Sequence, residues 1–212
     1  MAGMRVLREL RRGGFGVLAV VLLLGVLVGC ARSPRIRPLA ADAVVVAFGD
    51  SLTSGYGAEE EQDYPSVLAR RSGWRVVNAG VPGELSAAGV ARLPGVLEEH
   101  RPALVLLCHG GNDILTGNSA ETIRANLDAM IRLCREAGAE VVLLAVPQKG
   151  LRLKPAPFYA EVAKRNHVRL VEDAIVEVLS KNTLKSDYVH PNAEGYAQIA
   201  EAVLADLRRA QR

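Results

Sequence analysis

The chain has 212 residues, of which 50% are hydrophobic and only 4% aromatic, and this suits one α/β domain built largely from alanine, valine and leucine. Its formal charge of +3 comes from residues 1–29, which carry four arginines and one glutamate, while the remainder has 22 basic and 22 acidic residues. This balance does not indicate a nucleic-acid-binding protein, and we expect no nucleic-acid partner.

The N-terminal segment is typical of a bacterial export signal. Arginines precede an apolar stretch from Phe15 to Val28, which is too short to cross a bilayer comfortably. It ends in Leu27-Val28-Gly29-Cys30, which resembles the lipobox that directs lipidation of a cysteine and cleavage just before it. We therefore expect residues 1–29 to be a lipoprotein signal peptide and Cys30 to be a lipidated membrane anchor. An ordinary signal or anchor that contains a cysteine by chance is the alternative.

Residues 30–42 are predicted to be the lipidated cysteine and a flexible tether, because Pro34, Pro38 and three arginines leave little apolar periodicity. Residue 31 is alanine, not the aspartate expected of inner-membrane retention in the best-known lipoprotein sorting rule. This favours an exported lipoprotein that faces the periplasm from the outer membrane. The folded domain would then occupy residues 43–212.

Five short apolar runs in this domain are continuous rather than alternating, as parallel strands covered on both faces should be. They span Ala43–Phe48, Arg75–Asn78, Ala103–Cys108, Glu140–Val146 and Val168–Val171. Two further cysteines, Cys108 and Cys134, fall on apolar positions and are expected to be buried thiols rather than a disulfide or a metal pair.

Helical patterns lie between and after these runs. They span Tyr64–Arg71, Leu85–Glu99, Ser119–Ala137, Ala160–Asn166, Ala174–Ser180 and Asn192–Arg209. The second of these is expected to break or restart at Pro94, and the third to begin at a Ser119 cap and to stop at Gly138. The alternation predicts an α/β fold, a three-layer sandwich around a doubly wound sheet of about five parallel strands.

Ligands of such sheets bind beyond the carboxyl ends of the strands, and polar glycine-rich segments follow the first three strands here. Gly49-Asp50-Ser51-Leu52 offers a hydroxyl nucleophile. Asn78 to Glu84 contains Gly83, whose backbone N–H can face the site, and Gly110-Gly111-Asn112-Asp113 offers an amide donor. Near the C-terminus, Asp187-Tyr188-Val189-His190 offers a base with a carboxylate three residues before it.

These four segments, in this order, resemble the SGNH or GDSL hydrolases, and the resemblance extends from Val44 to the end of the chain. "GDSLTSGYGA", "GGNDIL" and "HPNAEGY" are most similar to the thioesterase I, lysophospholipase L1 and arylesterase group. The resemblance implies a flavodoxin-like sandwich and a serine esterase without metal or cofactor. It assigns Ser51 as nucleophile, His190 as base, Asp187 as the acid that orients it, and Ser51 N–H, Gly83 N–H and Asn112 as the oxyanion hole.

The sequence departs from the family pattern in two places. The second segment has Pro-Gly-Glu-Leu where relatives often have Ser-Gly-Asp-Thr, so the glycine is kept but the pocket wall should differ. The third is preceded by His109, for which we expect a packing or supporting role, because no acid stands at a suitable spacing before it. Asp50 and Asp113 are expected to stabilise turns rather than to bind a metal.

The substrate is less constrained by the sequence. The loop from Pro147 to Pro155 mixes aliphatic and basic residues, so it is either an acyl-chain wall with cations for a phosphate or carboxylate, or a solvated surface loop. We expect a monomer that acts on small-molecule or lipid esters such as aryl or alkyl esters, acyl thioesters or lysophospholipids. An acetyl esterase of envelope polysaccharide and a non-catalytic envelope lipoprotein are the alternatives.

Overall fold

A sheet of five parallel strands forms the centre of the structure, a computed structural model that describes residues 34–212. The strands are β1 (Val44–Gly49), β2 (Arg75–Gly80), β3 (Leu104–Cys108), β4 (Glu140–Leu144) and β5 (Arg169–Val171). They lie in the order β2-β1-β3-β4-β5, so the chain reverses direction across the sheet between β2 and β3. All five expected strands are confirmed, although β2 continues to Gly80 and β4 already ends at Leu144.

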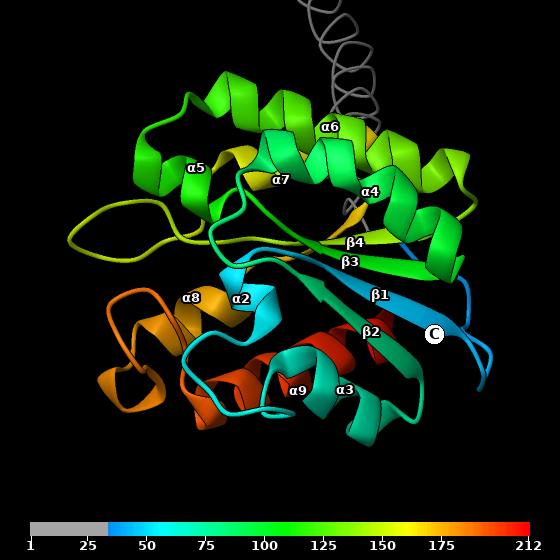
Figure 1. The fold of residues 1–212 in the computed structure, drawn as a ribbon, viewed down its shortest axis with the longest axis horizontal. Helices are drawn as coiled ribbons and strands as arrows, with labels where there is room; N and C mark the ends of the chain where they lie inside the picture. The colour runs from blue at the N-terminus through cyan, green and yellow to red at the C-terminus, as the bar shows by residue number, and fades with distance from the viewer. Residues whose placement is uncertain (1–33) are drawn as a thin grey trace, which may run out of the picture. The chain divides into compact units, whose positions relative to one another are not determined.

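Helices cover both faces of the sheet (Figure 1). One layer consists of α4 (Ser86–His100), α6 (Ala120–Glu136) and α7 (Phe158–Asn166), and the other of α3 (Tyr64–Ser72), α8 (Ala174–Leu179) and α9 (Ala193–Ala210). The expected three-layer α/β sandwich is therefore confirmed. Three short elements were not predicted: α2 (Ser51–Ser54), α5 (Gly111–Thr116) and a 3₁₀ helix, η1 (Asn182–Leu184).

The helix ends follow the capping residues in the sequence. Ser119 accepts a hydrogen bond from the backbone N–H of Thr122 at the start of α6, as predicted, and Gly138 follows its end with a positive φ of 81°. Asn192 caps α9 in the same way by accepting from Gly195 N–H. The buried stripe of α6 is the predicted one: Ile123, Leu127, Met130, Ile131 and Cys134.

The prediction that the second helix breaks at Pro94 was wrong, because α4 runs without interruption from Ser86 to His100. A proline inside a helix removes one intrahelical hydrogen bond. Pro94 lies on the exposed side of α4, where water can replace that bond, and Leu93 and Leu97 are buried on the side that faces the domain.

The predicted flexible tether, residues 30–42, is described from Pro34 onward, and this part is attached to the domain. Ile36 is only 7% exposed, and its backbone N–H donates to the carbonyl of Ala210 at the end of α9. The backbone N–H and the guanidinium of Arg37 both bind the carboxylate of Glu140. Two large apolar residues, Ile36 and Leu39, among prolines and arginines were too weak a signal to predict this attachment.

Other predictions about the N-terminus, the signal peptide 1–29 and the lipidated Cys30, lie outside the described residues. Between Pro34 and the C-terminus, no helix is both long and apolar enough to cross a membrane. Cys108 and Cys134 are buried free thiols, as expected. Burial raises the pKa of Cys134 to about 12 and also raises that of Cys108, so neither is a reactive thiolate near neutral pH.

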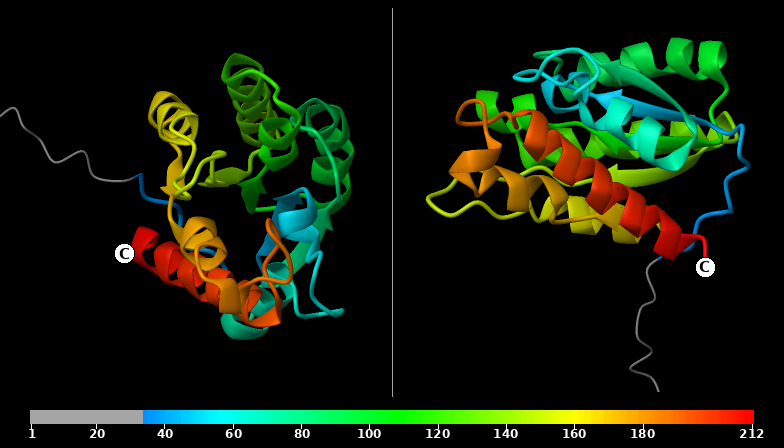
Figure 2. Two further views of the ribbon diagram at one scale, coloured as in Figure 1. Left: turned by 90° about the vertical axis from the view of Figure 1, so that its left-hand side faces the viewer. Right: turned by 90° about the horizontal axis from the view of Figure 1, so that it is seen from below.

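The carboxyl ends of the strands form one edge of the sheet, where the chain crosses from strands to helices. Figure 2 (left) looks onto this edge and shows α2 and the segment between α8 and α9 lying beside each other there. The other edge, where the strands begin, is called the amino edge below. The two edges lie at opposite ends of the strands, so a side chain beyond one is separated from the other by the whole sheet.

Candidate active site

Ser51 sits at the end of β1 on a short, rigid turn. Asp50 caps α2 by accepting the backbone N–H of Leu52 at 3.1 Å, and Ser51 is the first residue of that helix. Gly49 precedes them because a Cβ there would lie 2.1 Å from the carbonyl oxygen of Cys108. Ser51 is 8% exposed, so its hydroxyl has a fixed position with limited access to solvent.

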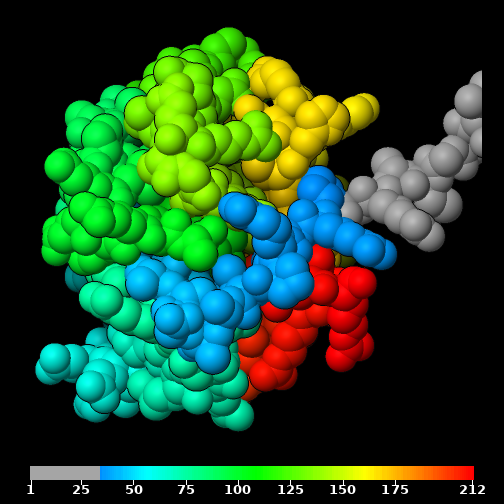
Figure 3. Space-filling model, turned by 90° about the vertical axis from the view of Figure 1, so that its right-hand side faces the viewer, coloured from blue at the N-terminus to red at the C-terminus, as the bar shows by residue number. Residues whose placement is uncertain are grey.

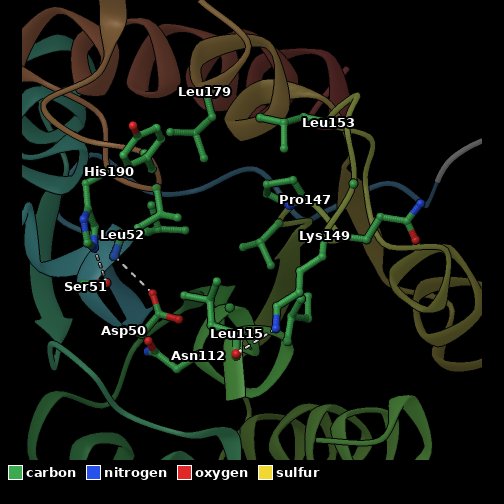
Figure 4. A pocket seen from close by; sticks show the side chains of 17 residues that line it. Asp50, Ser51, Leu52, Asn112, Leu115, Pro147, Lys149, Leu153, Leu179 and His190 are labelled. Atoms are coloured by element: carbon green, nitrogen blue, oxygen red, sulfur yellow. Dashed lines mark hydrogen bonds between the residues drawn. The ribbon is translucent and has the colours of Figure 1, made fainter. Parts of the chain in front are cut away.

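A hydrogen-bonded series connects Ser51 to the C-terminal segment. His190 Nε2 lies 3.0 Å from Ser51 Oγ, and His190 Nδ1 lies 2.8 Å from Asp187 Oδ2 (Figure 4 shows the first of these contacts). The ring of Tyr56 packs against the imidazole, with 4.6 Å between ring centroids. The three residues that the sequence suggested as nucleophile, base and orienting acid are thus brought together from opposite ends of the domain.

Asp187 also fixes the turn that carries His190. Its Oδ1 accepts the backbone N–H groups of Val189 and His190, both at 2.8 Å, while its other oxygen faces the imidazole. Partial burial raises the pKa of Asp187, but the hydrogen bonds from the His190 ring and from the two backbone N–H groups outweigh it. The net effect lowers the pKa, so this carboxylate is ionised throughout the neutral range.

The suggested oxyanion donors come from three loops. Asn112 lines the same pocket as Ser51 and His190, and one N–H of its side-chain amide donates to the carbonyl of Glu84 at 3.0 Å. Gly83, next to Glu84, has a φ of +77°, a conformation that favours glycine, and it is not among the residues that line the pocket. Ser51 is at the first position of α2, where the backbone N–H has no partner within the helix.

A partly buried ionic cluster lies behind these donors. The Glu84 carboxylate accepts from Arg92 Nε at 2.8 Å and Nη2 at 2.7 Å, and it lies 3.0 Å from His109 Nε2. Burial raises the pKa of Glu84, but the hydrogen bonds from Arg92 and His109 outweigh it and the pKa is lowered. His109 is fully buried and its Nδ1 accepts from Gly110 N–H, so it has a supporting position, with an acid that sequence spacing did not reveal.

Asp50 stabilises a turn, as predicted, by accepting Leu52 N–H, whereas Asp113 mainly connects α5 to the start of α4. Burial raises the pKa of Asp50, which lies directly beneath Ser51. Asp113 accepts from the backbone N–H and the hydroxyl of Ser86 and from the amide of Asn118, all within 3.0 Å. Among residues 34–212, no group of acidic, histidine and cysteine side chains has the arrangement of a metal site.

A pocket of about 230 Å³ opens beside Ser51, and its walls are largely apolar (Figure 4). The aliphatic and proline lining comes from the segments after β1, β3 and β4 and from α8 and the His190 segment: Leu52, Ile114, Leu115, Val146, Pro147, Leu153, Leu179 and Val189. Sequence reasoning missed Ile114, Leu115 and Leu179. The first two directly follow Gly110-Gly111-Asn112-Asp113, and their apolar character was the available signal.

The loop from Pro147 to Pro155 was predicted to be either a wall of the pocket or a solvated surface loop, and different residues of it are in each position. Lys149 and Leu153 line the pocket, and Lys149 Nζ donates to the carbonyl of Leu115 at 2.8 Å across the pocket. Arg152 and Lys154 are exposed and are not among the lining residues. One wall of the pocket is therefore formed by this loop, whereas two of its cations face solvent.

Comparison with known proteins finds relatives whose names are those of ester-hydrolysing enzymes. An arylesterase of Vibrio mimicus is 33% identical over 174 residues, which cover 77% of this chain and 87% of the relative. Thioesterase 1/protease 1/lysophospholipase L1 of Escherichia coli K12 is 32% identical over 180 residues, which cover 81% of this chain and 86% of the relative. The crystal structure of TesA superposes with a TM-score of 0.72 at 30% identity, covering 79% of this chain and 99% of that one.

This fold, with this arrangement of polar side chains at its carboxyl edge, defines an ester-hydrolysing enzyme of the SGNH type. More narrowly, the model of the GDSL-like lipase/acylhydrolase family matches residues 47–198, and the chain belongs to that family.

Proposed function

We propose that the protein is a serine esterase that hydrolyses carboxylic esters or thioesters through a covalent acyl-enzyme. One observation carries the proposal: Ser51, His190 and Asp187 form a continuous hydrogen-bonded series, and the serine borders an apolar pocket. A serine hydroxyl is a weak nucleophile because it must lose its proton as it attacks. An imidazole already hydrogen-bonded to it can take that proton.

In the proposed reaction, Ser51 Oγ attacks the acyl carbonyl while His190 Nε2 takes the hydroxyl proton. Asp187 holds the proton on Nδ1 and stabilises the imidazolium. The tetrahedral intermediate collapses when His190 returns the proton to the leaving alcohol or thiol, and the acyl group stays on Ser51. Water then attacks the acyl-enzyme with His190 again as base, which releases the carboxylic acid and restores the serine.

Three donors are proposed to stabilise the oxyanion of the intermediate: the backbone N–H groups of Ser51 and Gly83 and the side-chain amide of Asn112. The position of Asn112 supports this role. One N–H of its amide is held by the Glu84 carbonyl, which fixes the amide plane and leaves the other N–H for the substrate oxygen. A donor that is fixed before the reaction needs no reorganisation when charge develops.

Asn112→Ala is expected to lower kcat by about 10²- to 10³-fold with little change in KM, because the lost hydrogen bond acts mainly on the developing oxyanion. Steady-state kinetics on a soluble p-nitrophenyl ester measures this. Asn182→Ala, an exposed asparagine of η1, is the matched control. An Asn112→Ala enzyme that keeps its kcat would remove Asn112 from the oxyanion hole.

The pocket supports an acyl chain as the group that it binds. A buried methylene contributes about 0.8 kcal/mol, so each carbon that fits should raise kcat/KM by up to about fourfold. Across p-nitrophenyl esters from acetyl to palmitoyl, kcat/KM is expected to rise to a medium or long chain before it levels off. Activity confined to acetyl esters would contradict a lipid-directed enzyme and would favour a deacetylase of envelope polysaccharide.

We also propose that the enzyme is exported and anchored to the outer membrane through a lipid on Cys30, after cleavage of residues 1–29. The lipobox-like sequence supports this. Radioactive palmitate fed to bacteria that express the gene is expected to label the wild-type protein and not the Cys30→Ser variant, and the wild-type protein should fractionate with the outer membrane. Labelling that persists in Cys30→Ser would contradict the assignment.

A further inference from the structure

The helices that precede strands all end at the amino edge of the sheet. Helices α3, α4, α6 and α7 each lead within a few residues into β2, β3, β4 and β5, so their last turns lie where those strands begin. The end of α9 lies there too, because Ala210 accepts a hydrogen bond from Ile36 beside the start of β4. Figure 3 looks onto this edge, and the segment from Pro34 (blue) crosses it next to the end of α9 (red).

The amino edge is rich in exposed cations. Basic residues favour helix C-termini because they complement the helix dipole, and this fold brings several such termini to one side. The last turns of α3, α6, α7 and α9 contribute Arg70, Arg71, Arg135, Lys164, Arg165, Arg208 and Arg209. Exposed Arg35, Arg75 and Arg101 lie at the same edge, in the N-terminal segment, at the start of β2 and after α4.

Acidic residues at this edge are fewer, and several are neutralised in ion pairs. Glu140 is paired with Arg37, and Asp206 with Arg169 and Arg209. Arg71 and Arg165, two of the cations named above, are likewise paired with Glu201 and Asp128. Glu136 lies 3.6 Å from Arg132, and the other acids there are Asp42, Glu98 and Glu99. The neutral total charge of residues 30–212 therefore conceals an uneven distribution, which the sequence alone did not indicate.

A hollow of about 450 Å³ lies in this face, where the N-terminal segment meets the ends of α6 and α7. Arg35, Arg37, Arg135 and Arg169 line it, with Glu140 as its single acidic residue. Glu140 and Asp206 neutralise Arg37 and Arg169, whereas Arg35 and Arg135 form no ion pair with another residue of the described range. An anionic group that enters the hollow would meet two guanidinium groups without a carboxylate partner, one of which, Arg135, also donates to the carbonyl of Asn166.

The place where the described residues begin indicates which anionic group would meet this face. Pro34 lies at this edge and is four residues from Cys30, a stretch that spans at most about 14 Å when fully extended. A domain of this length has a radius of gyration of about 16 Å, so such a connection is too short to turn the domain over. A lipid on Cys30 would therefore keep the amino edge within reach of the bilayer.

We propose that the amino edge is a membrane-facing surface that binds the headgroups of anionic phospholipids, while the Ser51 pocket points away from the anchoring bilayer. The inference rests on the proposed anchor at Cys30. Arginine binds phosphate by paired hydrogen bonds, and attraction to an anionic surface acts within about 8 Å at physiological salt. The enzyme would then take its substrate from the aqueous side rather than from the bilayer that holds it.

The test places a fluorophore on either edge of the full-length protein in lipid nanodiscs that carry an acceptor dye on their headgroups. Ala137→Cys labels the amino edge and Glu60→Cys the carboxyl edge, both at exposed positions, while the native Cys108 and Cys134 are buried. Discs contain phosphatidylcholine alone or a mixture with phosphatidylglycerol. We expect stronger energy transfer from residue 137 than from residue 60, and an increase at residue 137 with phosphatidylglycerol that is lost in high salt.

A second experiment reverses the charge of exposed cations and measures the same energy transfer. Arg35→Glu with Arg208→Glu is expected to reduce the transfer from residue 137 in anionic discs to its value in neutral discs. Lys154→Glu with Lys181→Glu, exposed positions beyond the carboxyl edge, changes the net charge equally and should leave the transfer unchanged. Equal transfer from the two edges, no effect of phosphatidylglycerol, or failure of the protein to associate with either disc would overturn the proposal.

Two further measurements test lipid specificity and the esterase reaction separately. Labelled double-stranded DNA that binds as tightly as anionic discs would overturn a lipid-specific surface in favour of a general polyanion site. Hydrolysis of a soluble p-nitrophenyl ester, measured on the same samples, reports on Ser51 independently of the lipid composition. A protein without esterase activity that still shows stronger energy transfer from residue 137 than from residue 60 would contradict the proposed reaction and leave the membrane-facing surface supported.

Discussion

Replacing Ser51 with alanine is expected to lower ester hydrolysis by at least about 10⁴-fold without unfolding the protein. Removal of Oγ takes away the nucleophile, while Asp50 still caps α2 through the backbone N–H of Leu52, so the turn should persist. The rate of p-nitrophenyl ester hydrolysis measures the loss, and a fluorophosphonate probe reports the nucleophile directly. The probe should label the wild-type protein and not Ser51→Ala.

Ser72→Ala is the matched control, because this serine lies at the far end of α3, where it donates to the carbonyl of Leu68 and accepts from Trp74 N–H. It should keep its activity and its labelling. A folded wild-type protein that the probe does not label would support a non-catalytic envelope lipoprotein instead. Activity unchanged in Ser51→Ala would place the reaction elsewhere in the molecule.

Asp187→Asn is expected to reduce kcat by between about 10² and 10⁴-fold, the upper figure being typical of a buried triad carboxylate. The substitution is informative because an asparagine Oδ1 can still accept the backbone N–H groups of Val189 and His190, so the turn is kept. The atom that faces His190 Nδ1 changes from a carboxylate oxygen to an NH₂ donor, so the charge and the acceptor for the Nδ1 proton are both lost. Because the side chain of Asp187 is 43% exposed, water can partly replace it, and the loss should fall below the upper figure.

The pH dependence follows from the lowered pKa of Asp187. Its folded-state pKa lies below the unfolded value of about 4, so the stability that the ionised group contributes is present above that pH and is lost as the pH falls through the folded value. Asp187 is also already ionised above about pH 4. We therefore expect that protonation of Asp187 does not cause the fall in rate on the acid side of the wild-type pH–rate profile. An acid limb that disappears in Asp187→Asn would contradict this.

Much of the fold could be predicted because its signals are local. The strands are continuous apolar runs, and α6 carries its own cap, its buried stripe and its terminal glycine. The polar segments after the strands could be placed at one edge because parallel strands share a direction. Ser51 and His190, 139 positions apart, could be paired only through the family resemblance, since spacing does not reveal so distant a contact.

What could not be predicted depends on side chains that meet across the fold. Glu84 and His109 are 25 residues apart, and neither has a pattern that points to the other. Leu179 reaches the pocket because α8 lies beside it, which no periodicity in α8 indicates. The attachment of Ile36 to α9 depends on one hydrogen bond and one buried side chain. These contacts are set by packing between elements, for which local sequence carries little information.

The Glu84–Arg92–His109 cluster couples the segment after β2 to the segment after β3, so the two segments can be exchanged between related enzymes only together. Grafting the Ser-Gly-Asp-Thr sequence of relatives into the second segment alone would shorten the acid and leave Arg92 and His109 with an incomplete partner in a partly buried site. Replacing His109 alone would remove a donor from Glu84. Anyone who recombines this enzyme with its relatives should therefore move residues 82–92 and 108–112 together, since a crossover between them separates groups that depend on each other.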